Sequence, residues 1–146
     1  SLQDPGNLGT IVRTAEGAGA TGIIMNNATV DIYSPKVVRS TMGSIFRVPH
    51  IITPDLGATI KSLRTDYRIC VYAAHLKGQA YYSAFDFTKP TAFMIGNEGA
   101  GLSQEISDLA TSYLKIPMEG KLESLNASVA ASLLMYECHR QRAKES

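Results

Sequence analysis

Short, continuous apolar runs alternate with segments of helical character along this sequence. We expect strands at TGIIMN (21–26), VPHII (48–52), YRICVYAA (67–74), PTAFMIG (90–96) and SYLKIPM (112–118). Strands with one wet face would alternate apolar and polar residues, whereas mostly continuous apolar runs are typical of strands that are buried on both faces. The alternation therefore predicts one α/β domain, with a mainly parallel sheet and helices on both faces of it.

Helix-terminal residues mark the segments between these strands. Ser34 stands before Pro35, an N-cap followed by proline at the first helical position, and Thr53 stands before Pro54 in the same way. Gly17 and Gly19 close the first helical pattern. We expect helices over residues 7–19, 34–46, 53–64, 102–110 and 124–142.

Composition sets the bounds of the fold and of its partners. The chain has 146 residues, 45% of them apolar and 18% charged, which fits one globular domain with a core of its own. No apolar run approaches the roughly 20 residues of a membrane span. Cys70 and Cys138 have no motif spacing, so we expect two buried free thiols in a reducing cytoplasm. The scattered histidines predict no metal site, and a net charge of +1 gives no general argument for nucleic acid.

The opening residues, SLQDPGNLG, reach turn chemistry almost at once. We therefore expect a single domain over residues 1–146 that lacks its first strand and any N-terminal extension that binds substrate.

A glycine-rich loop follows the fourth expected strand. Gly96, Asn97, Glu98 and Gly99 stand there, and a further glycine follows at Gly101. A tight turn would explain the glycines alone, but a single carboxylate among them has no obvious packing role. The spacing matches neither the dinucleotide-binding fingerprint nor the Walker phosphate loop, which disfavours an ordinary NAD or ATP site. Ligands of parallel α/β sheets bind in such loops, beyond the carboxyl ends of the strands.

Two other loops lead into helices with polar residues at the same kind of place. Asn7 stands where it can cap the first helix, and Arg13 follows six residues later beside apolar neighbours. An arginine at the edge of such a face either reaches solvent or binds an anion. Ser124 and Asn126 precede the last helix, and capping explains one of them well and two poorly.

Three stretches together resemble a known family. In order, NLGTIVRTAEGAG, FMIGNEGAGLS and LKIPMEGKLESLNASVAASLLMYE are similar to the three motifs of the SpoU/TrmH family of RNA ribose methyltransferases, in the SPOUT superfamily. The segment VVRSTMGSIFRVP is also similar to that family, and the resemblance covers essentially the whole chain. It implies an α/β fold with a C-terminal trefoil knot, a feature that general folding rules would not predict.

The resemblance also implies a cofactor, a reaction and the residues of a site. The cofactor is S-adenosylmethionine without a metal, and the reaction is methyl transfer to a ribose 2′-hydroxyl of tRNA or rRNA. Arg13 is then catalytic, with Asn7, Glu98, Ser124 and Asn126 arranging RNA and hydroxyl. The implied cofactor pocket is lined by Ala73, Ala74, Gly96, Asn97, Gly99, Ile116, Met118, Leu125 and Asn126.

The implied partners are RNA and a second copy of the chain. Lys36, Arg39 and Arg47 are candidate phosphate contacts, and surface solvation explains these three residues equally well. Family likeness also implies a cytoplasmic homodimer in which Arg13 lies near the partner's cofactor. Two alternatives stay open, a non-catalytic RNA-binding protein of the same fold and a SPOUT methyltransferase that acts on a base.

Overall fold

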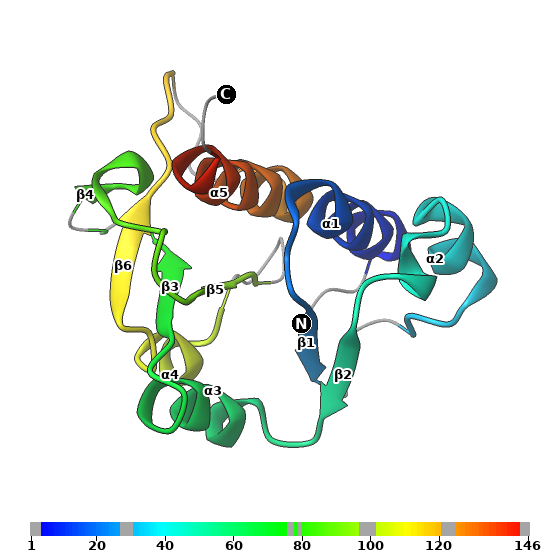
Figure 1. Cartoon of the computed structure of the whole chain (residues 1–146), viewed down its shortest axis with the longest axis horizontal. Helices are drawn as coiled ribbons and strands as arrows, with labels where there is room; N and C mark the ends of the chain where they lie inside the picture. The colour runs from blue at the N-terminus through cyan, green and yellow to red at the C-terminus, as the bar shows by residue number, and fades with distance from the viewer. Residues whose placement is uncertain are drawn as a thin grey trace.

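The structure is a computed structural model of the whole chain, shown in Figure 1. It describes residues 4–26, 31–75, 78, 80–96, 102–120 and 125–143. Glu98 and Ser124, to which the sequence assigned catalytic roles, lie outside these ranges, as do Asn97 and Gly99 of the expected cofactor pocket.

All described strand pairs are parallel, as predicted. β1 (Ile23–Asn26) pairs with β2 (His50–Thr53) in one sheet. The other sheet has the order β4-β6-β3-β5. Its strands are β4 (Ala80–Tyr81), β6 (Ser112–Lys115), β3 (Cys70–Ala74) and β5 (Thr91–Met94). The described strands thus form two sheets where the sequence pattern suggested one, and the short β4 was not expected.

Helices cover both faces of the larger sheet. Successive side chains of a strand point to opposite faces, so adjacent residues of β3 show what packs on each face. Val71 and Ala73 of β3 pack with Ile60 of α3 (Leu56–Thr65) and with apolar residues around α4 (Gln104–Ser107). Tyr72, between them, packs on the other face against Leu134 of α5 (Ala127–Arg142). The expected burial on both sides is therefore confirmed for the larger sheet, whereas Ile51 and Ile52 of β2 in the smaller sheet are 56% and 52% exposed.

The first helix starts earlier than the sequence suggested. α1 spans Pro5–Ala18 and is capped by Asp4, whose carboxylate accepts hydrogen bonds from the backbone amides of Gly6 (2.7 Å) and Asn7 (3.3 Å). Asn7 is therefore not the cap. It lies inside the helix and is only 8% exposed. The helix ends at Gly19 with φ 78°, the left-handed conformation that glycine adopts without strain.

Two further helix boundaries correct the sequence analysis. The helix expected over 34–46 is divided into α2 (Pro35–Ser40) and the 3₁₀ helix η1 (Ser44–Phe46), because Met42 (φ 53°) and Gly43 (φ 89°) take left-handed conformations. α3 is capped by Asp55, which accepts from the amide of Ala58 at 3.0 Å, and not by Thr53. A second 3₁₀ helix, η2, spans Tyr82–Ala84.

α1 is the central helix of one half of the molecule. It packs against α5 on one side and against α2 on the other (Figure 1). Gly9 of α1 allows the approach of α2, because a Cβ there would lie 1.7 Å from the hydroxyl oxygen of Ser40. The apolar cluster between these elements contains Leu8, Ile11, Val12, Ala15, Met25, Ile32, Val37, Ile45, Val48, Ala127 and Ala131.

α5 is tied to the larger sheet by a second, aromatic core. Leu134 and Leu114 are fully buried there beside Phe87 and Tyr72, whose rings meet edge to face with centroids 5.2 Å apart. Gln141 at the end of the helix accepts from the amide of Phe87 at 2.6 Å. α5 therefore bridges the two halves, since its other end packs on α1.

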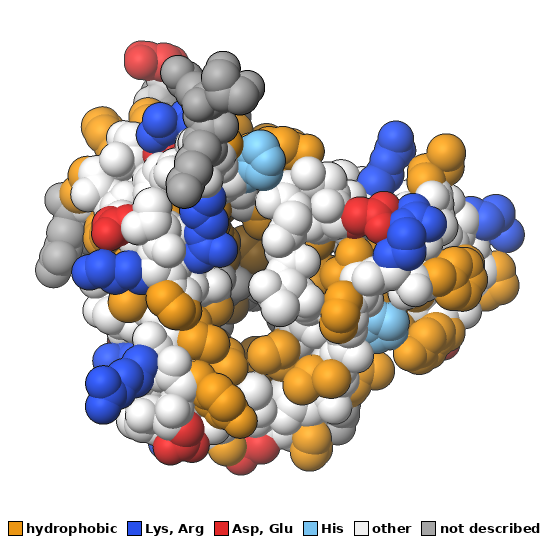
Figure 2. Space-filling view, viewed as in Figure 1, with side chains coloured by type: hydrophobic (Ala, Val, Ile, Leu, Met, Phe, Trp, Pro, Cys, Tyr) orange, Lys and Arg blue, Asp and Glu red, His pale blue; other side chains and the backbone are white. Residues whose placement is uncertain are grey.

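A cavity of about 910 Å³ lies between the two sheets. β1 lines one side and β5 lines the other, and neither strand pairs with a second neighbour within the described part of the chain. Figure 2 shows the molecule hollowed at this place. Most of the wall is apolar, and includes Ala18, Ile23, Met25, Ile60, Leu63, Ala92, Met94 and Met135.

Cys70 and Cys138 are free thiols, as expected, but each is only partly buried. Burial raises the pKa of the Cys138 thiol, which keeps it protonated. Among the described residues, no helix combines the length and the apolar character that a membrane span requires.

Candidate functional site

The carboxyl ends of three parallel strands meet at one edge of the larger sheet. In the register of the sheet, Ala73 stands beside Met94 of β5, and Ala74 stands beside Leu114 of β6. The residues that follow β5 and β6, Gly96 and Ile116, therefore leave the sheet next to Ala74. These are the loops in which open parallel sheets bind their ligands.

The N-termini of α1 and α5 come together near the same place. Leu8 of α1 and Ala127 of α5 belong to one apolar cluster, and Ile95, just after β5, packs against it. Asn7, Asn126 and Gly96 are the sequence neighbours of these three residues. One apolar cluster thus contains or contacts a residue from each of the three motifs.

Asn126 is the N-cap of α5. Its side-chain oxygen accepts hydrogen bonds from the backbone amides of Ser128 (2.9 Å) and Val129 (3.3 Å), and from the hydroxyl of Ser128 (2.6 Å). The residue is nevertheless exposed, and Leu125 before it is half-buried. Capping fixes the oxygen of the amide group toward the helix.

The other described residues of the expected cofactor pocket differ in how far they are exposed. Ala73 is buried, Ala74 is exposed, and Gly96, Ile116 and Met118 are half-buried. Small and apolar side chains at the ends of the strands leave space and backbone groups to a ligand.

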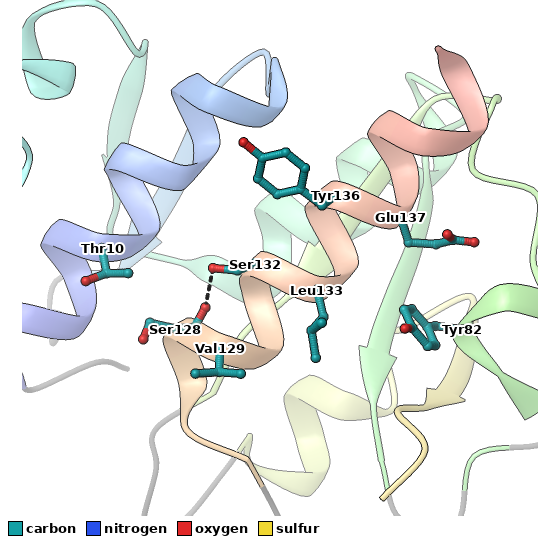
Figure 3. Close-up of a pocket in the computed structure, with 8 residues that line it drawn as sticks. All are labelled: Thr10, Tyr82, Ser128, Val129, Ser132, Leu133, Tyr136 and Glu137. Atoms are coloured by element: carbon teal, nitrogen blue, oxygen red, sulfur yellow. Dashed lines mark hydrogen bonds between the residues drawn. The ribbon is translucent and has the colours of Figure 1, made fainter. Parts of the chain in front are cut away.

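Arg13 lies apart from this cluster. It is six residues beyond Asn7, which is about 9 Å along the axis of α1, and it is exposed. One turn before it, Thr10 lines a groove of about 450 Å³ between α1 and α5 (Figure 3). Figure 3 shows that most of the groove is formed by the outer face of α5, with Ser128, Val129, Ser132, Leu133, Tyr136 and Glu137.

This outer face of α5 was not predicted from the sequence. Val129 is 47% exposed, Leu133 36% and Tyr136 47%, so apolar side chains follow one another at helical spacing on the surface. The sequence contains a signal for this exposed face. A helix that packs on one side needs a single apolar stripe, whereas this helix carries apolar residues on several sides.

The three expected RNA contacts are all on the surface of the α2–η1 region. Lys36 and Arg39 are exposed. Arg47 is also exposed, but its guanidinium binds the carboxylate of Glu16, with Nη2 donating to Oε1 at 2.8 Å. This hydrogen bond holds the pKa of Glu16 below its usual value and raises that of Arg47. Arg47 would have to share its donors between Glu16 and a phosphate.

No group of three or more His, Cys, Asp or Glu side chains that could hold a metal ion is found among the described residues.

Comparisons with known proteins identify the family of the chain. The profile of the SpoU rRNA Methylase family matches residues 1–136. The 23S rRNA (uridine(2479)-2′-O)-methyltransferase of Streptomyces viridochromogenes is 39% identical to this chain, over 94% of the chain and 50% of that protein. The 23S rRNA (guanosine(2553)-2′-O)-methyltransferase of Bacillus subtilis (strain 168) is 35% identical, over 93% of the chain and 54% of that protein.

The solved structure of the SpoU methyltransferase AviRb from Streptomyces viridochromogenes, in complex with AdoMet, has a TM-score of 0.89 and 39% identity. The match covers 97% of this chain and 57% of that one. The chain therefore spans about half the length of the relatives that it matches. The profile match and both identities point the same way: the chain belongs to the SpoU rRNA methylase family.

Proposed function

We propose that the chain forms the catalytic domain of a cytoplasmic RNA methyltransferase, which transfers a methyl group from S-adenosylmethionine to a ribose 2′-hydroxyl of rRNA or tRNA. The observation that carries the proposal is that one apolar cluster contains Leu8 and Ala127 and has Ile95 packed against it, so it joins a residue from each of the three motifs. Relatives named as 2′-O-methyltransferases, and a neighbour solved with AdoMet, support the same reading.

The cofactor would be held by the strand-end loops. Ala73, Gly96, Ile116, Met118 and Leu125 would surround it, with Asn97 and Gly99 as further contacts. When bound, S-adenosylmethionine supplies an electrophilic methyl group on a sulfonium. We expect the full-length protein to bind it in the presence of a chelator, and isothermal titration calorimetry measures this. A folded protein that shows no heat of binding for S-adenosylmethionine, or that binds it only with a metal ion, would refute the assignment.

Arg13 would act on the RNA rather than on the cofactor. A guanidinium stays charged in proteins, so it does not serve as the general base. Its planar fork can hold a backbone phosphate and the 2′-oxygen together and stabilise the negative charge that develops there. The proton of the hydroxyl would then pass to a phosphate oxygen or to water. Asn7, Glu98, Ser124 and Asn126 would orient the hydroxyl and the neighbouring groups.

A homodimer would complete the site. Arg13 lies about 9 Å along α1 from Asn7, so within one chain it is displaced from the strand-end cluster. The groove beside it exposes Val129, Leu133 and Tyr136, an apolar strip suited to a self-complementary interface. We propose that α1 and α5 of two copies pack here and place Arg13 of one chain at the partner's cofactor.

Subunit mixing tests whether the sites are shared. Arg13→Ala and Asn126→Ala homodimers should each be nearly inactive. A heterodimer of the two variants should regain activity, because one of its composite sites keeps both residues. Single-turnover methylation by heterodimers purified with two affinity tags measures this. Heterodimers as inactive as the parents would show that each chain holds a complete site.

We also propose that the cavity between β1 and β5 holds a further β-strand of the full-length protein, just before α1. Both facing edges belong to parallel strands, and the wall is mostly apolar. An edge strand presents a row of unpaired backbone N–H and C=O groups, which proteins commonly pair or cover. A strand that feeds α1 and lies parallel to β1 forms the usual right-handed crossover unit with it. The smaller sheet and the larger one would then become a single sheet.

Hydrogen exchange measures the state of these edges. In the full-length protein, we expect the amides of β1 and β5 that face the cavity to be protected about as strongly as those of the central strand β3. Fast exchange at those amides, with β3 protected, would mean that the cavity is not filled by a strand.

A further inference from the structure

Three large apolar side chains are unusually exposed on the surface formed by α2, η1 and the turn before α2, here called the α2–η1 surface. Phe46 is 80% exposed, Met42 68% and Tyr33 64%. Water-exposed aromatic and methionine side chains that gather at one place mark an interaction site. The view in Figure 2 shows apolar and basic side chains together on the side of the molecule that carries α2.

The backbone beneath Phe46 is firmly held. Ser44 and Ile45, just before it, are 3% and 5% exposed. The hydroxyl of Ser44 donates to Oε1 of Glu16 on α1 at 3.0 Å, and the amide of Phe46 donates to the carbonyl of Gly43 at 3.1 Å. Phe46 therefore points outward from a rigid segment, and a ligand that contacts it does not have to order the backbone first.

Met42 shows local strain at the same surface. Its φ of 53° is a backbone conformation that residues other than glycine, asparagine and aspartate rarely adopt. The turn is closed by Gly43 at φ 89°, where an added Cβ would lie 3.3 Å from Nη1 of Arg47. Strained residues of this kind cluster at binding sites.

The charges around Phe46 favour an anionic partner. Lys36, Arg39 and Arg47 are basic and exposed, and Asp31 is the only acidic residue between 31 and 48. The Asp31 carboxylate already accepts a hydrogen bond from the amide of Tyr33 at 2.9 Å. The nearby carboxylate of Glu16 is paired with Arg47. The net positive charge disfavours a purely apolar protein partner and favours a phosphate backbone.

Tyr33 provides a second flat ring. Its hydroxyl lies 2.9 Å from Nε2 of His50, and the two ring centroids are 5.7 Å apart. The contact holds the Tyr33 ring in place while leaving most of it open to solvent. Aromatic rings beside basic side chains form the usual surface for unpaired nucleotides, because every base has a face that stacks.

We propose that the α2–η1 surface binds a single-stranded stretch of the RNA that flanks the target nucleotide. A base stacks on Phe46, Met42 and Tyr33 border it, and Arg39 and Lys36 bind the adjoining phosphates. This proposal rests on the proposed function, since it assigns part of the RNA footprint of the same enzyme. The surface is separated by α1 from the groove on α5, so a dimer formed through that groove leaves it open.

Binding of a short single-stranded oligoadenylate to the full-length protein tests the proposal. Phe46→Ala should weaken binding by about 5- to 100-fold, the range expected for one stacked base. Phe46→Trp should retain it. Arg39→Gln should instead lower the slope of log affinity against log salt by about 0.7, the effect of one lost phosphate contact on a single strand.

Tyr67→Ala is the matched control, because Tyr67 is 68% exposed but lies in the turn after α3. An affinity of Phe46→Ala equal to that of this control would overturn the proposal. A change in sedimentation of Phe46→Ala would also overturn it, by showing that Phe46 belongs to a protein interface. A wild-type protein that binds oligoadenylate through Phe46 but methylates no RNA would instead refute the proposed function.

Discussion

Arg13→Lys should slow methyl transfer by about 10²- to 10³-fold, the usual effect of removing one donor aimed at developing charge. Lysine keeps the positive charge but loses the planar fork that can hold a phosphate and the 2′-oxygen together. Arg13 is exposed and about 9 Å along α1 from Asn7, away from the strand-end loops of its own chain. Affinity for S-adenosylmethionine should therefore change little.

Single-turnover methylation and calorimetry on the same preparations separate the two effects. Arg64→Lys is the control, because Arg64 is another exposed arginine, whose Nη1 donates to the carbonyl of Leu109 in a different part of the fold. Near-normal turnover by Arg13→Lys would mean that a simple charge suffices. Loss of cofactor binding would mean that Arg13 belongs to the cofactor pocket and not to the RNA side.

Leu134→Ala should lower the free energy of unfolding by about 2–5 kcal/mol, the range for removing a large aliphatic side chain from a core. Leu134 is fully buried among Tyr72, Phe87 and Leu114. The aromatic rings around it contact one another, so they cannot easily collapse into the space. The loss would also loosen α5, whose first turn positions Asn126.

Urea denaturation of the full-length protein at fixed concentration measures this effect. Leu134→Met is the matched control, since it keeps the volume and should cost less than about 1.5 kcal/mol. Equal destabilisation by both variants would mean that the shape of the side chain, and not the lost volume, sets the stability of this core.

The order of the elements could be predicted from the sequence, but several boundaries could not. Continuous apolar runs indicated β1, β2, β3, β5 and β6. Burial on both faces explains the run in β3, whereas Ile51 and Ile52 of β2 are more than half exposed. The helix starts were predicted less well. Asp4 and Asp55 took the capping positions expected for Asn7 and Thr53. All of these residue types are good caps, so local propensity alone does not choose between neighbours.

The break after α2 and the two-residue strand β4 were also missed. Met42 adopts a left-handed conformation because the packing of Thr41, Ser44 and Ile45 fixes the chain on either side of it. Such tertiary constraints are not visible in a local pattern. β4 is too short to carry a period, and it exists through its pairing with β6.

The site was predictable where the topology alone determines proximity. Parallel strands carry Ala74, Gly96 and Ile116 to one edge. Leu8 and Ala127, near the starts of α1 and α5, belong to the apolar cluster against which Ile95 packs. In the proposed dimer, the position of Arg13 relative to a cofactor depends on the second chain, so neither the sequence pattern nor one subunit determines it. The groove on α5 was not predicted because apolar residues at helical spacing are equally consistent with a buried face of the helix.

The central claim is methyl transfer to a ribose, and one measurement tests it directly. The full-length protein is incubated with S-adenosylmethionine labelled in its methyl group and with total RNA from cells that lack the protein. The RNA is digested to nucleosides, and the labelled products are identified by mass spectrometry. We predict the label in one 2′-O-methylnucleoside, on the ribose. Label on a base, or an active cofactor-binding protein that labels no RNA, would contradict the account.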